Sequence, residues 1–313
     1  MQLLIGFLFV LRLGFCYFNS VAVAAKHAIA TNRAKRVLIL DWDIHHGNGT
    51  QDLTYDDSNI MYISLHRYAE RGEYFFPGRG KHNQVADGTN VNIAWTSGKM
   101  GNVEYAAAFS ELILPLVADW TPDLFLVSCG FDAAKGDLIG DCELTPDLYY
   151  CMTRSLLEVC GNDKPLVVAL EGGYNINVIA KCMEGVALAL LDEPWDQESE
   201  PRGWSGEEED DVKELSVMEN GCGRLKRARN TLTLYWRHNE SSSDNQGRIK
   251  QSAARCLNKT MAAVETAPLW ADRITLRRFP MQNTPEKTLR TVRTRASRKQ
   301  DDELSNLFDS LAL

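Results

Sequence analysis

The sequence predicts an α/β fold with a mainly parallel β-sheet, from three observations. Four short runs are apolar throughout rather than alternating, as expected of strands that are buried on both faces of a parallel sheet. Stretches with a helical pattern lie beside and between these runs. The two kinds of segment follow one another in the order typical of α/β domains. The apolar runs are RVLIL (36–40), IMYISL (60–65), LFLVSC (124–129) and PLVVAL (165–170), and the helical stretches are 19–31, 102–119, 145–160 and 175–191.

The segments between these elements differ in composition. The run NVNIAW (90–95) alternates more than the others and predicts a further strand. Residues 66–89 are rich in glycine and too long for a simple connection, which favours a binding loop. Residues 192–214 carry eleven Asp and Glu against two Lys and Arg, which predicts a solvated linker. From 237 onward polar residues predominate and no long hydrophobic period is present.

The overall composition excludes several classes of protein. A net charge of −8 argues against non-specific DNA binding as the main activity, and no direct sequence-specific contact with nucleic acid is expected. No run reaches the roughly 18 apolar residues that a membrane span requires, so no membrane is expected as a partner. The eight cysteines form no C-x-x-C pair, which favours reduced thiols over a disulfide framework.

The first thirteen residues, MQLLIGFLFVLRL, form an apolar leader. Ala22-Val23-Ala24 offers the small residues of a signal-peptidase site, but the leader has no basic start and Arg12 interrupts its apolar run. These features disfavour a signal peptide, and an alternative or incorrect exon is the preferred explanation.

Polar residues with metal-binding chemistry follow three of the predicted strands. Asp43 and His45 come directly after the first apolar run, Asp132 after the third, and Tyr174 after the fourth and a pair of glycines. Taken singly, the plainer explanations are a hydrogen-bonded turn, a helix N-cap and a packed aromatic ring. Because the carboxyl ends of parallel strands meet at one edge of a sheet, these residues together predict a metal-binding site there.

Six separate motifs identify the family that the chain resembles. They are GFCYFNSVAVAAKHA (14–28), DWDIHHGNGTQ (41–51), MYISLHRY (61–68), FFPGRG (75–80), SCGFDAAKGD (128–137) and LEGGYN (170–175). In this order they resemble class II zinc-dependent histone deacetylases, from Gly14 to about Leu191 and more weakly to Trp236. Asn48 and Glu171 are similar to class II rather than class I. The resemblance implies the three-layer α/β/α fold shared with arginase, in partial form.

The resemblance also implies a role for each site residue. Asp43, His45 and Asp132 would ligate a catalytic Zn²⁺ and leave an open position for water and substrate, as catalytic zinc sites do. Tyr174 would donate a hydrogen bond to the oxyanion that develops during the reaction. The channel for the acetyl-lysine stem would be lined by Gly14, Phe15, Phe76, Ile139 and Gly173. A structural K⁺ would be held by Asp41, Ser64 and Leu65, together with the backbone of Asp43 and His45.

Residue types at a few other positions refine this interpretation. Ile139 is apolar where an acidic residue would have indicated a polyamine substrate, so acetyl-lysine is favoured. Asp41 also matches the carboxylate that orients a catalytic histidine in the family. His46, His66 and His82 are expected to be hydrogen-bonded structural histidines.

The activity implied by the resemblance is the zinc-dependent hydrolysis of acetyl groups from lysine side chains of histones or other proteins, with a role in chromatin and transcription repression. The expected partners are acetylated histone tails or other acetyl-lysine proteins, and a co-repressor complex. A basic tract at 273–299 and the leucines at 304, 307, 311 and 313 favour movement between nucleus and cytoplasm.

The predicted organisation has four parts. They are the leader (1–13), a partial deacetylase domain without its N-terminal third (14–191), an acidic linker with the last helix of the domain (192–236), and a polar and basic tail that is expected to be disordered (237–313).

One departure from the family concerns the general base. Family members carry a His-His pair in a Pro-Gly-His-His context shortly before the Gly-Phe-Cys motif, whereas the residues before Gly14 contain no histidine. His27 lies beyond the motif, on a predicted helix, and is not a substitute. Two other interpretations stay open: a catalytically inactive deacetylase-like scaffold, and an arginase-like hydrolase with paired Mn²⁺, which would require more acidic ligands.

Overall fold

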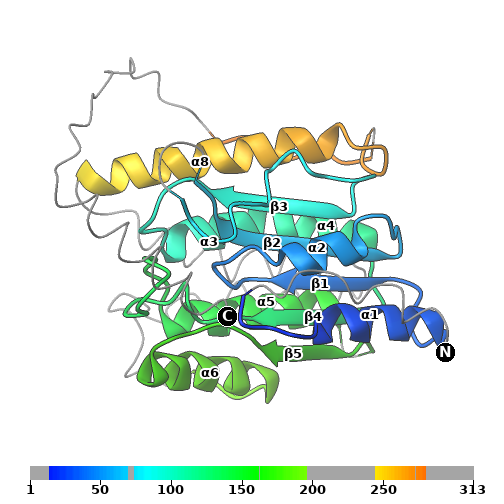
Figure 1. Ribbon diagram of the computed structural model, residues 1–313, viewed down its shortest axis with the longest axis horizontal. Coiled ribbons are helices and arrows are strands. Elements are labelled where there is room, and N and C mark those ends of the chain that lie inside the picture. Colours follow the sequence, from blue (N-terminus) through cyan, green and yellow to red (C-terminus); the bar gives the residue numbers. More distant parts are fainter. Residues whose placement is uncertain (1–13, 70–73, 162, 196–243, 272, 280–313) are drawn as a thin grey trace, which may run out of the picture. The chain divides into compact units, whose positions relative to one another are not determined.

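The computed structural model describes residues 14–69, 74–161, 163–195, 244–271 and 273–279, in which five strands form one parallel sheet (Figure 1). The order across the sheet is β3-β2-β1-β4-β5, and every neighbouring pair is parallel. The strands are β1 (Val37–Asp41), β2 (Ile60–Arg67), β3 (Asn90–Trp95), β4 (Leu124–Cys129) and β5 (Leu166–Leu170). They coincide with the five runs predicted from the sequence, so the predicted sheet is confirmed.

The order of the strands creates a switch point beside β1. β2 and β3 follow on one side of β1, whereas β4 and β5 lie on its other side. In open parallel sheets, ligands bind beyond the carboxyl ends of the strands at such a point. Asp41 at the end of β1 is in register with Ser64 of β2 and Ser128 of β4, so the loops that follow β1 and β4 start side by side.

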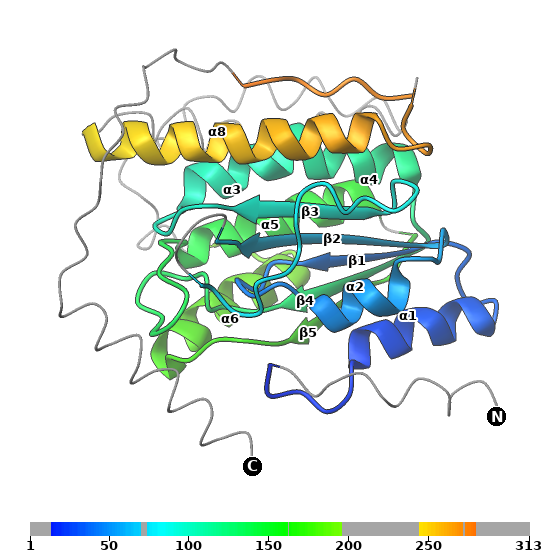
Figure 2. The ribbon, with the colours of Figure 1, turned by 45° about the horizontal axis from the view of Figure 1, so that its top comes forward.

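Helices cover both faces of the sheet and complete three layers (Figure 2). On one face lie α1 (Ser20–Ala30) and α2 (Asn48–Thr54). The other face carries α3 (Asn102–Ala108), the π-helical segment η1 (Phe109–Ile113), α4 (Leu114–Trp120), α5 (Pro146–Cys160) and α6 (Ile176–Leu190). The helix predicted at 102–119 is therefore one helical stretch with a π-helical segment in its middle.

Two apolar clusters, one on each face, explain why the strands are apolar without alternation. Val37 and Ile39 of β1 pack with the buried residues of α1. Leu38 and Leu40, which point the other way, belong to the larger cluster on the opposite face. Each residue of a strand between two helical layers is thus buried, as expected for this kind of sheet.

The helix α8 (Asp244–Glu265) packs against β3 and α3 (Figure 1). The prediction of a disordered tail at 237–313 therefore does not hold for 244–271 and 273–279. The buried residues of this helix recur every three or four positions along one side, and most of them are small: Ser252, Ala253, Cys256, Leu257, Thr260, Met261 and Val264. Past the helix, the indole Nε1 of Trp270 donates to the carbonyl oxygen of Gly88 at 2.7 Å.

β5 is the outermost strand on its side among the described residues, and it is less buried than β1. Val167 and Leu170 are 50% and 59% exposed, whereas every residue of β1 is buried. None of the described helices is long and apolar enough to cross a membrane. The leader at 1–13, the linker from 196, most of the basic tract and the leucines from 304 onward lie outside the described residues.

Candidate metal centre

The loops after β1 and β4 bring one imidazole and two carboxylates together. One candidate ligand atom from each of Asp43, His45 and Asp132 lies within 4.8 Å of the other two. Nδ1 of His45 is 2.9 Å from Oδ2 of Asp132 and 3.2 Å from Oδ1 of Asp43. The three side chains predicted to lie at the carboxyl edge of the sheet thus converge at the switch point between β1 and β4.

Backbone amides hold both carboxylates in place. Oδ1 of Asp132 accepts the N–H of Ile44 at 2.8 Å, which joins the two ligand-bearing loops directly. Oδ1 of Asp43 accepts the N–H of His45 at 2.8 Å, and its Oδ2 accepts the N–H of Gly172 at 2.9 Å. The loop after β5 is therefore fastened to the same carboxylate.

Gly172 is required by this close approach. A Cβ at this position would lie 2.4 Å from a carboxylate oxygen of Asp132 and equally close to one of Asp43. No other residue fits there without displacing the two carboxylates. The first glycine of the pair before Tyr174 thus has a steric role.

A positive charge between the three groups would stabilise them, as the pKa shifts of each group indicate. Burial and the neighbouring charge of Asp43 raise the pKa of Asp132 to about 7. Burial would also raise the pKa of Asp43, but hydrogen bonds and charge from His45 outweigh it and lower that pKa. For His45, burial is outweighed by the hydrogen bonds to Asp132 and Asp43, which raise its pKa to about 10.

These residues fit a divalent metal ion. The proton on His45 Nδ1 supplies the positive charge that two converging carboxylates require, and a divalent ion bound by the same atoms would supply it instead. Carboxylate and imidazole groups are both known zinc ligands, and three protein ligands leave a fourth position open, as in catalytic zinc sites. The part of the chain that the structure describes holds this one such group.

Aromatic rings surround the imidazole of His45. The ring of Phe75 is stacked on it, with centroids 5.1 Å apart and an interplanar angle of 10°. Phe76 and Tyr174 meet it edge-on, at 6.2 and 6.4 Å. Burial and the charges of Asp132 and Asp43 raise the pKa of Tyr174, so its hydroxyl remains a donor.

The predicted channel residues are only partly brought together. A Cβ on Gly14 would lie 3.9 Å from Phe76, so these two residues are neighbours. Phe15, by contrast, is 75% exposed, and Ile139 is also exposed. Gly173 has a φ of +135°, a conformation that glycine alone adopts readily.

The residues predicted for a potassium site lie at the ends of β1 and β2. Asp41 is buried, and its carboxylate accepts the hydroxyl of Tyr62 at 2.8 Å and the N–H of Asp43 at 3.1 Å. Burial, followed by the charge of Asp43, raises the pKa of Asp41. Ser64 is hydrogen-bonded to Nδ1 of His66 at 2.9 Å, and Leu65 is buried. Potassium binding by these residues stays a prediction.

Two other histidines of the motifs are buried and hydrogen-bonded, as expected of structural histidines. Nε2 of His46 pairs with Oε1 of Gln51 at 3.1 Å, and Nε2 of His66 pairs with the carbonyl oxygen of Gly80 at 2.8 Å. Burial lowers the pKa of His46 to about 4 and holds that of His66 well below its usual range. Both side chains are neutral at pH 7.

Sequence reasoning missed Phe75 and Arg67. The guanidinium of Arg67 lies over the ring of Phe75, 4.8 Å from its centroid, and is 3.6 Å from the carboxylate of Asp141. Arg67, Phe75 and His45 thus form a stack beside the metal site. Phe75 and Phe76 both belong to the motif FFPGRG, and nothing local in the sequence indicates which of the two rings stacks on His45.

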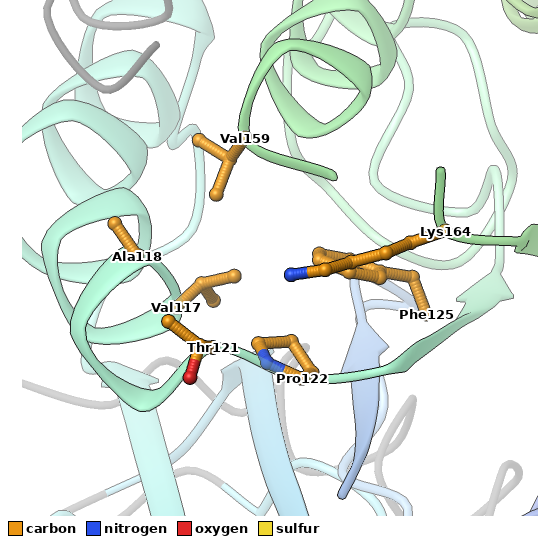
Figure 3. Close-up of a pocket in the computed structure, with 7 residues that line it drawn as sticks. All are labelled: Val117, Ala118, Thr121, Pro122, Phe125, Val159 and Lys164. Carbon is orange, nitrogen blue, oxygen red and sulfur yellow. The ribbon is translucent and has the colours of Figure 1, made fainter. Parts of the chain in front are cut away.

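A small cavity lies at the opposite end of the sheet (Figure 3). It is lined by Val117, Ala118, Thr121, Pro122, Phe125, Val159 and Lys164, and the Lys164 ammonium points into it. Its volume of 40 Å³ holds about three water molecules. It is too small for a substrate and is separate from the metal site.

Comparisons with known proteins match the chain to one family. The sequence profile of one family, described as the histone deacetylase domain, matches residues 11–190. Histone deacetylase HDA1 of Saccharomyces cerevisiae is 44% identical over 196 residues, which cover 60% of this chain and 27% of the relative. Histone deacetylase 7 of Homo sapiens is 42% identical over 201 residues, which cover 61% of this chain and 21% of the relative.

Solved structures of deacetylases are also similar. The structure of the HD domain of HDA15 matches with a TM-score of 0.55 and 35% identity, over 79% of this chain and 61% of that domain. The histone deacetylase Clr3 matches with a TM-score of 0.55 and 33% identity, over 78% of this chain and 41% of that protein. The chain thus spans only about a quarter of the length of the curated relatives it matches.

Proposed function

The chain belongs to the histone deacetylase family, in its class II branch, and on this premise we propose that it is a zinc-dependent deacetylase of N-acetyl-lysine side chains. The observation that carries this proposal is the convergence of Asp43, His45 and Asp132 at the switch point, beside Tyr174. Three protein ligands are the usual number for catalytic zinc. A hydrolase with paired Mn²⁺ would need more acidic ligands than this group offers.

In this proposal the ligand residues and Tyr174 have different roles. Asp43, His45 and Asp132 hold the Zn²⁺, which when bound supplies Lewis-acid chemistry at the acyl carbonyl and lowers the pKa of water. The phenol of Tyr174 donates a hydrogen bond to the carbonyl oxygen as negative charge develops there. Phe76 and Gly14 flank the apolar stem of the lysine and keep water away from it.

A measurement of bound metal tests the proposal. Elemental analysis of the purified chain should find about one zinc per chain, as for a single catalytic site. Asp132→Ala should lose most of it, because this carboxylate is buried between the other two ligands. The matched control is Asp123→Ala, since Asp123 also accepts two backbone amides but lies at the opposite end of β4. An unchanged zinc content in Asp132→Ala would contradict the assignment.

Four further features are proposed from the resemblance to the family. They are a structural K⁺ at Asp41, Ser64 and Leu65, acetylated histone tails or other acetyl-lysine proteins as substrates, a co-repressor complex, and a role in transcription repression. We also propose shuttling between nucleus and cytoplasm, supported by the basic tract and the terminal leucines. If a tagged chain with Leu307→Ala and Leu311→Ala distributes between nucleus and cytoplasm as the unaltered chain does, the proposed export signal is wrong.

A further inference from the structure

Asp137 has a role in the structure that neither the ligand set nor the channel explains. Its Oδ1 accepts the backbone N–H of Ile139 at 2.8 Å and that of Gly140 at 3.2 Å, which closes a tight turn. Its Oδ2 accepts the backbone N–H of Tyr174 at 2.7 Å. One carboxylate therefore binds three amides from two segments that are 37 residues apart in the sequence.

The turn that Asp137 closes lies directly against the metal ligand Asp132. A Cβ on Gly140 would be only 1.8 Å from the carbonyl oxygen of Asp132, so the turn returns into contact with the backbone of that ligand. A second hydrogen bond supports the link to the β5 loop, because Nδ2 of Asn175 donates to the carbonyl oxygen of Gly136 at 2.9 Å. The turn thus contacts Asp132 on one side and is hydrogen-bonded to the segment of Tyr174 on the other.

Tyr174 needs such an anchor more than the metal ligands do. It follows two glycines, and Gly173 has a positive φ, so the chain before it has little conformational preference of its own. The strand that precedes these glycines, β5, is the outermost one described on that side. A hydrogen-bond donor contributes to an oxyanion site only when it is held where the charge will develop.

We propose that Asp137 is a positioning residue, which fixes the phenol of Tyr174 relative to Asp132 and so determines how strongly the site binds an acyl oxygen. This inference rests on the proposed function. It assigns Asp137 to the side of the site that acts on the substrate and not to the side that binds the metal. Removing the carboxylate should therefore weaken binding of an acyl-like ligand and leave the zinc content unchanged.

A double-mutant cycle on the full chain tests the inference, with suberoyl hydroxamic acid as the probe and isothermal titration calorimetry as the readout. Asn at position 137 keeps one accepting oxygen, which can serve the turn or Tyr174 but not both. Asp137→Asn should weaken binding about tenfold, the effect of losing one hydrogen bond to a charged group. Tyr174→Phe should weaken it at least as much, and the double variant should bind no worse than Tyr174→Phe.

Additive effects would overturn the proposal, since they would mean that Asp137 acts on the fold and not through Tyr174. Wild-type affinity in Asp137→Asn would overturn it too. Asp123→Asn is the matched control, and its effect should be small and additive with that of Tyr174→Phe. Thermal melting of each variant shows whether a loss of binding reflects unfolding.

A separate readout covers the case in which the wild-type chain holds no zinc, which would contradict the proposed function. With ¹³C-labelled tyrosine, the ring signal of Tyr174, assigned with Tyr174→Phe, should be single and well dispersed in the wild type. It should broaden or move toward the random-coil position in Asp137→Asn. An unchanged signal would overturn the positioning role, whatever the metal content.

Discussion

The interior strands and the outermost strand β5 hold their site residues in different ways. The loops after β1 and β4 start from buried, fully paired strands, and the bond from Ile44 N–H to Asp132 joins them at the base. Tyr174 instead follows β5, which is half exposed, and two glycines. The sheet itself thus organises the proposed metal ligands, whereas hydrogen bonds between loops organise Tyr174, the group proposed to act on the substrate. We therefore expect that substitutions in the two regions can affect metal binding and turnover separately.

The largest expected effect is a low rate of turnover in the unaltered chain, which should still bind zinc. The chain of 313 residues should bind zinc yet turn over a fluorogenic acetyl-lysine peptide about 10²–10⁴-fold more slowly than a class II domain that carries the His-His pair, because a positioned general base typically supplies that factor. No histidine precedes Gly14, and His46 and His66 are buried and hydrogen-bonded. Steady-state assay of the zinc-replete chain measures this. A rate within tenfold of the domain with the His-His pair would show that another group acts as the base.

A steric change tests whether the β5 loop also contributes to metal binding. Gly172→Ala should weaken zinc binding about 10–100-fold, the range seen when groups that orient metal ligands are altered, because the new Cβ would displace both carboxylates. Competition with a chromophoric chelator gives the affinity. Gly49→Ala in α2 is the matched control, since its Cβ would make only ordinary contact at 3.8 Å. Equal zinc affinity in the two variants would mean that the β5 loop is independent of the ligands.

The stack of Phe75 on His45 should have a smaller effect. Phe75→Leu should weaken zinc binding about two- to tenfold, the contribution expected of one stacked ring pair, because the imidazole would lose its orientation. The d–d absorption of the Co²⁺-substituted chain should change as well, since it reports on ligand geometry. Phe75→Tyr keeps the ring and should restore both properties. If Phe75→Leu and Phe75→Tyr behave alike, the stack does not position His45.

The smallest expected effect concerns His66 on the interior strand β2. In the unfolded chain His66 takes up a proton near its ordinary pKa of about 6.5, whereas burial keeps the folded-state pKa well below that value. The folded state then binds fewer protons, so this histidine lowers the free energy of unfolding as the pH falls below about 6.5. The groups that face it are His46, Ser64 and the carbonyl oxygen of Gly80.

Urea unfolding at pH 7 and pH 5 measures this contribution. His66→Gln should make the difference between the two midpoints smaller than in the wild type, while His27→Gln on the exposed side of α1 should not. Comparison of variants is needed because the carboxylates of the site also titrate in this range. The same pH dependence in His66→Gln and the wild type would contradict the prediction.

The sequence was most informative where local pattern and burial coincide. Strands such as β1 are buried on both faces, so their composition alone identifies them, and parallel pairing then places Asp43 and Asp132 at one edge. The helix α8 was missed because its buried residues, such as Ala253 and Thr260, are small or polar. Thr260 donates to the carbonyl oxygen of Asn92, 168 residues away, and no local pattern indicates such a contact. The role of Asp137 also depends on a distant partner, the amide of Tyr174.

The separation of the ligands along the chain determines when the site can form during folding. The bond from Ile44 to Asp132 spans 88 residues, and the bond from Gly172 to Asp43 spans 129. The pairing of β1 with β4 closes a loop of nearly the same length, since Val37 lies opposite Leu124, so we expect the site to form together with this central pairing. The three proposed ligands would therefore come together only as the centre of the sheet forms. Zinc that binds only to the folded site would slow unfolding and leave the rate of folding unchanged.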